Sequence, residues 1–151
     1  AIGGQLLPAD RAPALLTQQF AARCAGRNGL VINLLDAKVA APNPDFYSYT
    51  VSKLGLAGLT ALQARALAPN IRVNGIAPSV TLVSGPQTRE NFDRAHVYNP
   101  LRRGVLVEHV VMTMQYLIAL PTVTGQVITL DAGQRMLGMP RDVAFMVGDD
   151  A

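Results

Sequence analysis

The sequence predicts an α/β domain built on a parallel sheet, and three observations support this. Helical and extended patterns alternate along the 151 residues, as is typical of α/β crossovers. The predicted strands are short, nearly continuous apolar runs, as expected of strands covered on both faces. Half of the residues are hydrophobic and 15% are charged, against about a quarter charged in an average soluble domain. That composition excludes intrinsic disorder and indicates an oligomer or part of a larger whole.

The first half predicts a helix, a strand and a second helix. Residues 1–11 look irregular, and apolar residues at helical spacing predict a helix from residue 12, with Pro13 in its first turn. A strand buried on both faces is predicted at 30–35, and after a Pro-containing loop a long helix at 46–68.

The second half repeats the alternation. A strand at 71–77 ends at Pro78, and a helix at 108–120 precedes a strand at 124–130. Residues 79–106 form a long loop with polar helical fragments at most, and loops of this length are often lids or binding loops. The tail, 134–151, has no clear pattern. We therefore predict one partial domain over 1–151, with its core at 12–135.

Composition also argues against several kinds of partner. The net charge is +3, but the arginines are scattered and aromatic residues are 5%, which disfavours a nucleic-acid surface. The longest apolar stretch, 110–120, is too short to cross a membrane. Cys24 is the single cysteine, so we expect a buried, reduced thiol and a cytoplasmic location. The two histidines have no metal-ligand spacing, and we predict no metal site.

Ligands of parallel α/β sheets bind beyond the carboxyl ends of the strands. Three predicted strands are followed directly by Asp36, by residues 79–81 and by Asp131. These positions are therefore the first candidates for a site.

Tyr49 and Lys53 form a second candidate group near the start of the long helix. Residues four apart lie one turn apart on one helix face. A lysine ammonium favours the phenolate, so we expect it to lower the tyrosine pKa from its usual value of about 10. Such a pair is a candidate proton donor. By itself the pattern also arises in an exposed aromatic–cation contact.

Taken together, four stretches resemble the carboxyl-terminal half of a short-chain dehydrogenase/reductase. They are Val31-Ile32-Asn33, Tyr49-x-x-x-Lys53, the run from Leu67 to Pro78, and Gly125 with Asp131 and Gly133. The resemblance covers roughly residues 12–135 and implies a Rossmann-like doubly wound parallel sheet. The Gly-rich turn with which such domains begin is absent from this sequence, so we expect either a fragment or a degenerate relative.

Asp36 stands where this family usually has a serine, thirteen residues before the tyrosine. An aspartate there resembles the pteridine reductases and the related dihydromonapterin or dihydrofolate reductases. That resemblance implies NADPH-dependent reduction of a pterin-like C=N bond. Tyr49 would deliver or relay the proton, and Lys53 would hold the nicotinamide ribose and tune Tyr49. Asp36, protonated or bridging through water, would hold the tyrosine and help to deliver the proton. Asp36 as a loop carboxylate that caps backbone N–H groups is the structural alternative.

The resemblance also implies the cofactor contacts. NADPH is expected, with NADH as the alternative, because the segment that discriminates them is not in this sequence. Tyr49 and Lys53 would contact the cofactor, and Leu34 would line the cofactor face. The backbone of Pro78, Ser79, Val80 and Thr81 would meet the nicotinamide and phosphates. Ser79 replaces the usual glycine. Alternatives to a pterin reductase are a carbonyl reductase of the same family and a non-catalytic module that has lost the cofactor.

The helix at 46–68 carries small residues on several faces, among them Gly55, Gly58, Ala61 and Ala64. Members of the family commonly pair through this helix. We therefore expect a homodimer or homotetramer.

Overall fold

The computed structural model describes residues 8–148. Its helices are α1 (Pro8–Cys24), α2 (Tyr47–Ala66), α3 (Arg89–Val97), α4 (Val107–Ala119) and α5 (Val143–Met146), its strands are β1 (Gly29–Leu34), β2 (Ile71–Pro78) and β3 (Val127–Leu130), and two 3-10 turns are η1 (Ala37–Val39) and η2 (Gln134–Leu137).

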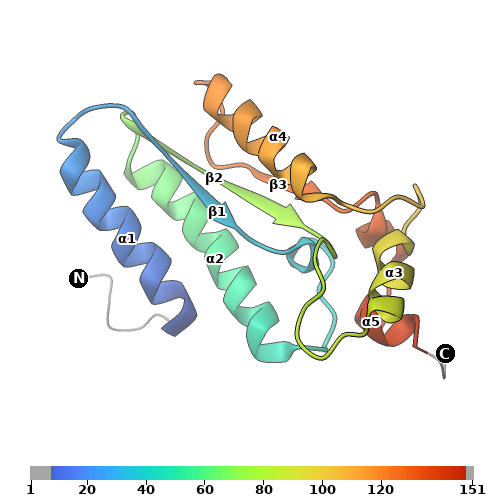
Figure 1. The fold of residues 1–151 in the computed structure, drawn as a ribbon. Coiled ribbons are helices and arrows are strands. Elements are labelled where there is room, and N and C mark those ends of the chain that lie inside the picture. Colours follow the sequence, from blue (N-terminus) through green and yellow to red (C-terminus); the bar gives the residue numbers. More distant parts are fainter. Residues whose placement is uncertain (1–7, 149–151) are drawn as a thin grey trace.

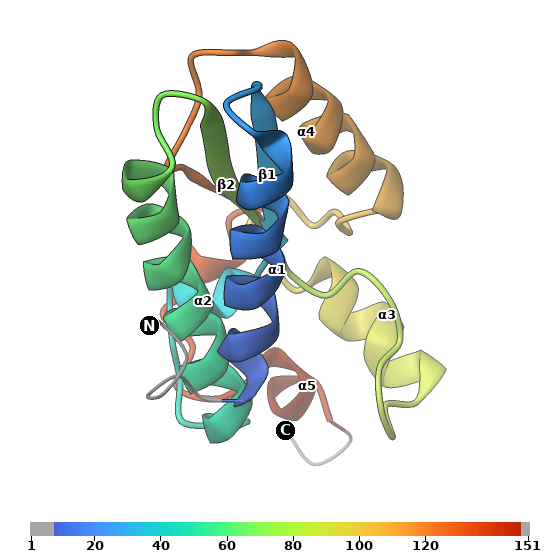
Figure 2. The same cartoon turned by 90° about the vertical axis from the view of Figure 1, so that its left-hand side faces the viewer.

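The strands form one parallel sheet in the order β1-β2-β3. Asn33 of β1 lies opposite Gly75 of β2, which in turn lies opposite Val127 of β3. Helices α1 and α2 lie side by side on one face of the sheet, and α4 lies on the other (Figures 1 and 2). The predicted parallel α/β arrangement is confirmed, and the carboxyl ends of all three strands share one edge.

The core lies between the sheet and the two long helices. One cluster joins Leu35 and Ala77 to Leu56 and Leu59 of α2, and a second includes Cys24, Ala64, Ile71 and Val73. Cys24 is buried, as predicted. A buried bond from Asn33 Nδ2 to Thr60 Oγ1, 2.9 Å long, joins β1 to α2. This bond fixes the strand that leads to Asp36 against the helix that carries Tyr49.

The first strand is less covered than its apolar sequence predicts. Asn33 is the one buried residue of β1, and Leu34 is 48% exposed. Within the described residues β1 pairs with β2 alone, so its outer edge has no neighbour. An apolar strand at the edge of a sheet indicates surface that another element or chain is expected to cover.

Helix boundaries differ from the prediction mainly at α1. It begins at Pro8, so Pro13 lies inside the helix rather than in its first turn. A proline there removes one backbone bond, and the helix still forms because its neighbours are good helix formers and Ala14 packs into the core. The predicted irregular segment 1–11 is thus helical from residue 8 onward, and its earlier part lies outside the described residues.

The predicted loop at 79–106 contains a nine-residue helix, α3, and the tail contains η2 and α5. Thr88 Oγ1 caps α3 by accepting from Asn91 N, and Phe92 and Ala95 are buried. Asn91 Nδ2 donates to Ala144 O across to α5. The pattern was hidden because the buried face of so short a helix holds two apolar residues. Over residues 8–148, no helix is both long and apolar enough to cross a membrane.

Candidate active site

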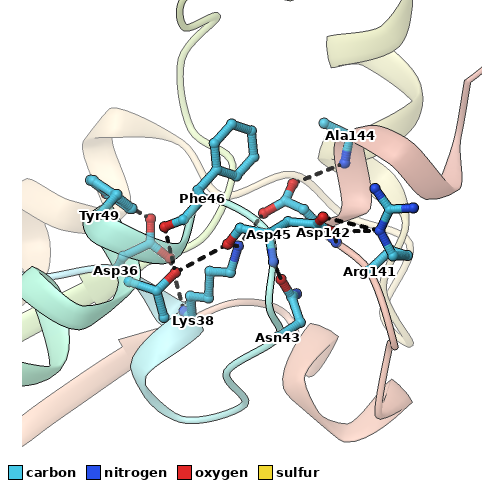
Figure 3. Close-up of polar contacts among 10 residues, drawn as sticks. Asp36, Lys38, Asn43, Asp45, Phe46, Tyr49, Arg141, Asp142 and Ala144 are labelled. Atoms are coloured by element: carbon cyan, nitrogen blue, oxygen red, sulfur yellow. Dashed lines mark hydrogen bonds and ion pairs between the residues drawn. The ribbon is translucent and has the colours of Figure 1, made fainter.

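The carboxylate of Asp36 is held from two sides directly beyond β1. Its Oδ1 accepts from Lys38 N at 2.8 Å, which caps η1, and its Oδ2 accepts from Tyr49 Oη at 2.9 Å (Figure 3). Backbone capping and contact with the tyrosine are therefore both true of this one side chain. Oδ1 caps η1, and Oδ2 contacts the tyrosine hydroxyl.

Tyr49 and Lys53 lie on the same face of α2, as their spacing predicts. Lys53 Nζ lies 5.6 Å from the centre of the Tyr49 ring and donates to Leu34 O at 2.8 Å. The structure thus brings Asp36, Tyr49 and Lys53 together at the carboxyl end of β1. Tyr49 as a whole residue remains 45% exposed.

The expected effect of Lys53 on Tyr49 is wrong for this structure. Partial burial, followed by the charge of Asp36 and the hydrogen bond to it, raises the pKa of Tyr49 above its ordinary value. The ammonium of Lys53 donates to the Leu34 carbonyl and not to the phenol, and Lys53 is not among the groups that shift this pKa. The phenol therefore stays protonated through neutral pH.

Helix α2 begins in an unusual backbone conformation. Phe46, its N-cap, has φ 51° and ψ 47°, in the left-handed region that costs a non-glycine residue energy. The Phe46 ring stacks on Phe145 with centroids 5.6 Å apart. Thr50 Oγ1 donates to Phe46 O at 3.0 Å. These contacts hold the turn that delivers Tyr49.

We call the hydrogen-bonded pair Asp36 and Tyr49 the dyad. Sequence reasoning missed a group of charged residues next to it. Lys38 is buried, and its Nζ donates to Asp45 O at 2.7 Å and to Asp142 Oδ2 at 3.0 Å. Arg141 Nε lies 2.8 Å from Asp45 Oδ2, and Figure 3 shows these residues as one connected network. The pKa of Asp45 is lowered, first by its bond with Arg141. No local spacing signals contacts between residues about a hundred positions apart.

The residues predicted to meet a cofactor lie along the same edge. Leu34 is half exposed, and Pro78, Ser79, Val80 and Thr81 are partly buried. Ser79 N donates to Leu130 O at 2.9 Å, and Thr81 Oγ1 donates to Ser79 O at 2.8 Å. The bond to Leu130 O holds the backbone at Ser79 against β3, and the Thr81 bond is local to the loop.

Asp131, the third residue that follows a strand, is buried within its own turn. It accepts from the backbone N–H groups of Gly133 and Arg135 and pairs with the Arg135 guanidinium. Its oxygens are used by these contacts, so we assign it a structural role. No group of three or more candidate metal ligands occurs in the described part of the chain.

Comparison with known proteins points to one family. The sequence profile described as Enoyl-(Acyl carrier protein) reductase matches residues 11–135. The dihydromonapterin reductase of Escherichia coli O6:K15:H31 is 29% identical over 106 residues, which are 70% of this chain and 44% of that protein.

Two solved structures are similar in fold. One is the FolM alternative dihydrofolate reductase 1 of Brucella canis, complexed with NADP, at TM-score 0.80 and 39% identity; the match covers 83% of this chain and 51% of that one. The other is a 4-hydroxyisoleucine dehydrogenase complexed with NADH, at TM-score 0.72 and 27% identity, covering 83% and 57%. The chain spans about half the length of these proteins. It belongs to the short-chain dehydrogenase/reductase family.

Proposed function

We propose that the full-length protein containing this chain is an NADPH-dependent reductase of a pterin-like or folate-like C=N bond. The observation that carries the proposal is the 2.9 Å bond between Tyr49 Oη and Asp36 Oδ2. The similarity to a dihydromonapterin reductase and to an NADP-bound alternative dihydrofolate reductase supports it.

In this proposal Tyr49 gives a proton to the substrate nitrogen. The phenol is protonated at neutral pH, and its raised pKa makes it a weaker acid than a free tyrosine, so its contribution depends on its placement beside Asp36. Asp36, which accepts the phenol hydrogen in the resting site, orients the hydroxyl, and a proton from solvent restores the phenol after transfer. General acid catalysis of this kind contributes about 10²- to 10⁴-fold to a rate.

The residues at the sheet edge fit a nicotinamide cofactor. Lys53 uses one of its N–H groups on the Leu34 carbonyl and has further donors for ribose hydroxyls. The exposed Leu34 side chain offers an apolar surface at the carboxyl end of β1, and the backbone at 78–81 follows the carboxyl end of the neighbouring strand β2. When bound, the cofactor supplies the hydride, which protein side chains cannot. NADH is the alternative cofactor.

A carbonyl reductase of the same family is the second candidate. It rests on Tyr49 and Lys53, which would protonate a carbonyl oxygen equally well, and the second solved structure is named as a dehydrogenase. In that case Asp36 has only a structural role, as the cap of η1 and as a hydrogen-bond partner of Tyr49. The third candidate, a non-catalytic module, predicts that the full-length protein does not bind NADPH.

Steady-state assays of the full-length protein separate these candidates. NADPH consumption is measured with dihydrobiopterin, with dihydrofolate and with a panel of ketones, for the wild type and for Asp36→Ala. We expect turnover of a dihydropterin, and a loss of about 10²-fold or more in Asp36→Ala. Asp93→Ala, which removes an exposed carboxylate paired with Arg89, is the matched control. Retained activity in Asp36→Ala with ketone turnover supports the second candidate instead.

Oligomerisation and location are further proposals. Leu54 and Leu62 are exposed at 40% and 69% on α2, with Gly58 between them, and we propose that this face packs on a second copy. Ala64, expected on such a face, instead lies in the core. The single, buried cysteine supports a cytoplasmic location. We also expect the 151 residues alone to bind NADPH weakly or not at all, because the sequence contains no Gly-rich phosphate turn.

A further inference from the structure

We propose that Lys38 is a positioning residue that sets the distance between Asp36 and Tyr49 and ties it to the carboxyl-terminal segment 141–146. This inference rests on the proposed function, because it assigns the dyad a role in proton transfer. Lys38 has no contact with either dyad side chain through its ammonium, so it acts through the backbone and the connecting loop.

The first support is the way in which Lys38 closes the loop between the two dyad residues. Asp36 lies before the loop and Tyr49 lies after it. At one end, Lys38 N donates to Asp36 Oδ1 at 2.8 Å. At the other end, Lys38 Nζ donates to Asp45 O at 2.7 Å, one residue before the cap of α2. One residue thereby fixes both ends of the segment 36–46.

The second support is the burial of the ammonium. The Lys38 side chain is 7% exposed, and a buried charge persists in a fold when partners hold it. Its partners are the Asp45 carbonyl and the Asp142 carboxylate, and the Phe46 ring lies 5.0 Å from Nζ. This geometry also supports the left-handed conformation of Phe46, from which α2 and its tyrosine start.

The third support is that Asp142 is itself fixed from the opposite side. Its backbone N donates to Asp45 Oδ2 at 2.7 Å, and its Oδ1 accepts from Ala144 N at 3.1 Å (Figure 3). Arg141 Nε binds both oxygens of Asp45, and Phe145 stacks on Phe46. Segment 141–146 therefore packs against the loop at 36–46, and the bond from Lys38 to Asp142 is the buried contact between the two segments.

A double-mutant cycle in the full-length protein tests whether Lys38 acts through Asp36. K38M keeps the aliphatic stem and removes the charge, and we expect kcat to fall about tenfold to a hundredfold with the KM for NADPH nearly unchanged. In a D36N background the same change is expected to lower kcat less than about twofold, because residues that act as one unit are not additive. K38R, which keeps the charge, is expected to restore most of the activity.

The cycle separates failure of this inference from failure of the proposed function. If D36N leaves kcat unchanged, the proposed function fails. If D36N lowers kcat but K38M lowers it equally in both backgrounds, or has no effect, only the positioning role is overturned. R89M, which removes an exposed cation paired with Asp93, is the control and is expected to leave kcat unchanged.

Amide hydrogen exchange gives a readout that needs no substrate. K38M is expected to raise exchange together in 36–46 and in 141–146 by about tenfold, since both segments lose the contact that joins them. The milder D142N, which keeps the Asp45 carbonyl contact, is expected to raise it less. Unchanged exchange in both segments overturns the inference whatever reaction the protein catalyses.

Discussion

Replacing Thr60 by valine tests the alignment of β1 on α2, on which the geometry of the site depends. Thr60 is fully buried, and its Oγ1 donates to Leu56 O and accepts from Asn33 Nδ2. In T60V the shape of the side chain is kept, and the Leu56 carbonyl remains within α2. The buried Asn33 amide, however, loses its hydrogen-bond acceptor. A buried polar group left without a partner costs about 1–3 kcal/mol. We expect the free energy of unfolding to fall by that amount.

The matched control is T113V. Thr113 Oγ1 makes the same kind of bond to the carbonyl four residues earlier, His109 O at 2.8 Å, and no side-chain amide depends on it among the described contacts. We expect a change within about 0.5 kcal/mol. Urea unfolding of the full-length protein, followed by circular dichroism, measures both variants, with m-values compared to check for two-state behaviour. Equal stability of T60V and T113V refutes the role given to the Asn33–Thr60 bond.

Three further predictions follow from the same contacts. Because the pKa of Tyr49 is raised, the Tyr49–Asp36 contact stabilises the fold fully below the ordinary tyrosine pKa, and this stabilisation is lost as pH rises through the raised value. The phenolate absorbance of Tyr49, measured as the difference from Y49F, should therefore appear above about pH 10, and at a lower pH in D36N than in the wild type. The lowered pKa of Asp45 means that its pairing with Arg141 stabilises the fold above the ordinary aspartate pKa, and that this stabilisation is lost as pH falls through the lowered value. The loss of stability in D45N should therefore be present at pH 7 and become smaller below about pH 4. L62E should split the proposed oligomer in light scattering, whereas L101E, at a residue of similar exposure, should not; an unchanged mass for L62E counts against the α2 interface.

Patterns local in the chain predicted most of the fold. Apolar runs gave the three strands to within a few residues, and the spacing of Tyr49 and Lys53 put them on one helix face, as observed. The limits of α1 and the existence of α3 were missed, because packing of Ala14 and Phe92 outweighs weak local signals. Contacts of long range were beyond local reasoning altogether. Lys38 and Asp142 are 104 residues apart, and nothing near either residue marks the pair.

The pKa of Tyr49 shows the same limit within the site. The spacing to Lys53 predicts a lowered value, but the direction depends on where the ammonium points and on which group faces the hydroxyl. The fold directs Lys53 toward Leu34 O and Asp36 toward the phenol. Chemistry that depends on orientation thus needed the structure, whereas the choice of the three residues as candidates did not.

The central claim is that Tyr49 donates the proton in reduction of a pterin-like substrate. The most direct test is the rate of NADPH consumption by the full-length Y49F variant with dihydrobiopterin or dihydrofolate, alongside NADPH binding measured by fluorescence. The account predicts a fall in kcat of about 10²-fold or more with NADPH affinity retained, because Lys53 and the backbone at 78–81 are untouched. A Y49F variant that turns over dihydropterin at close to the wild-type rate would contradict it.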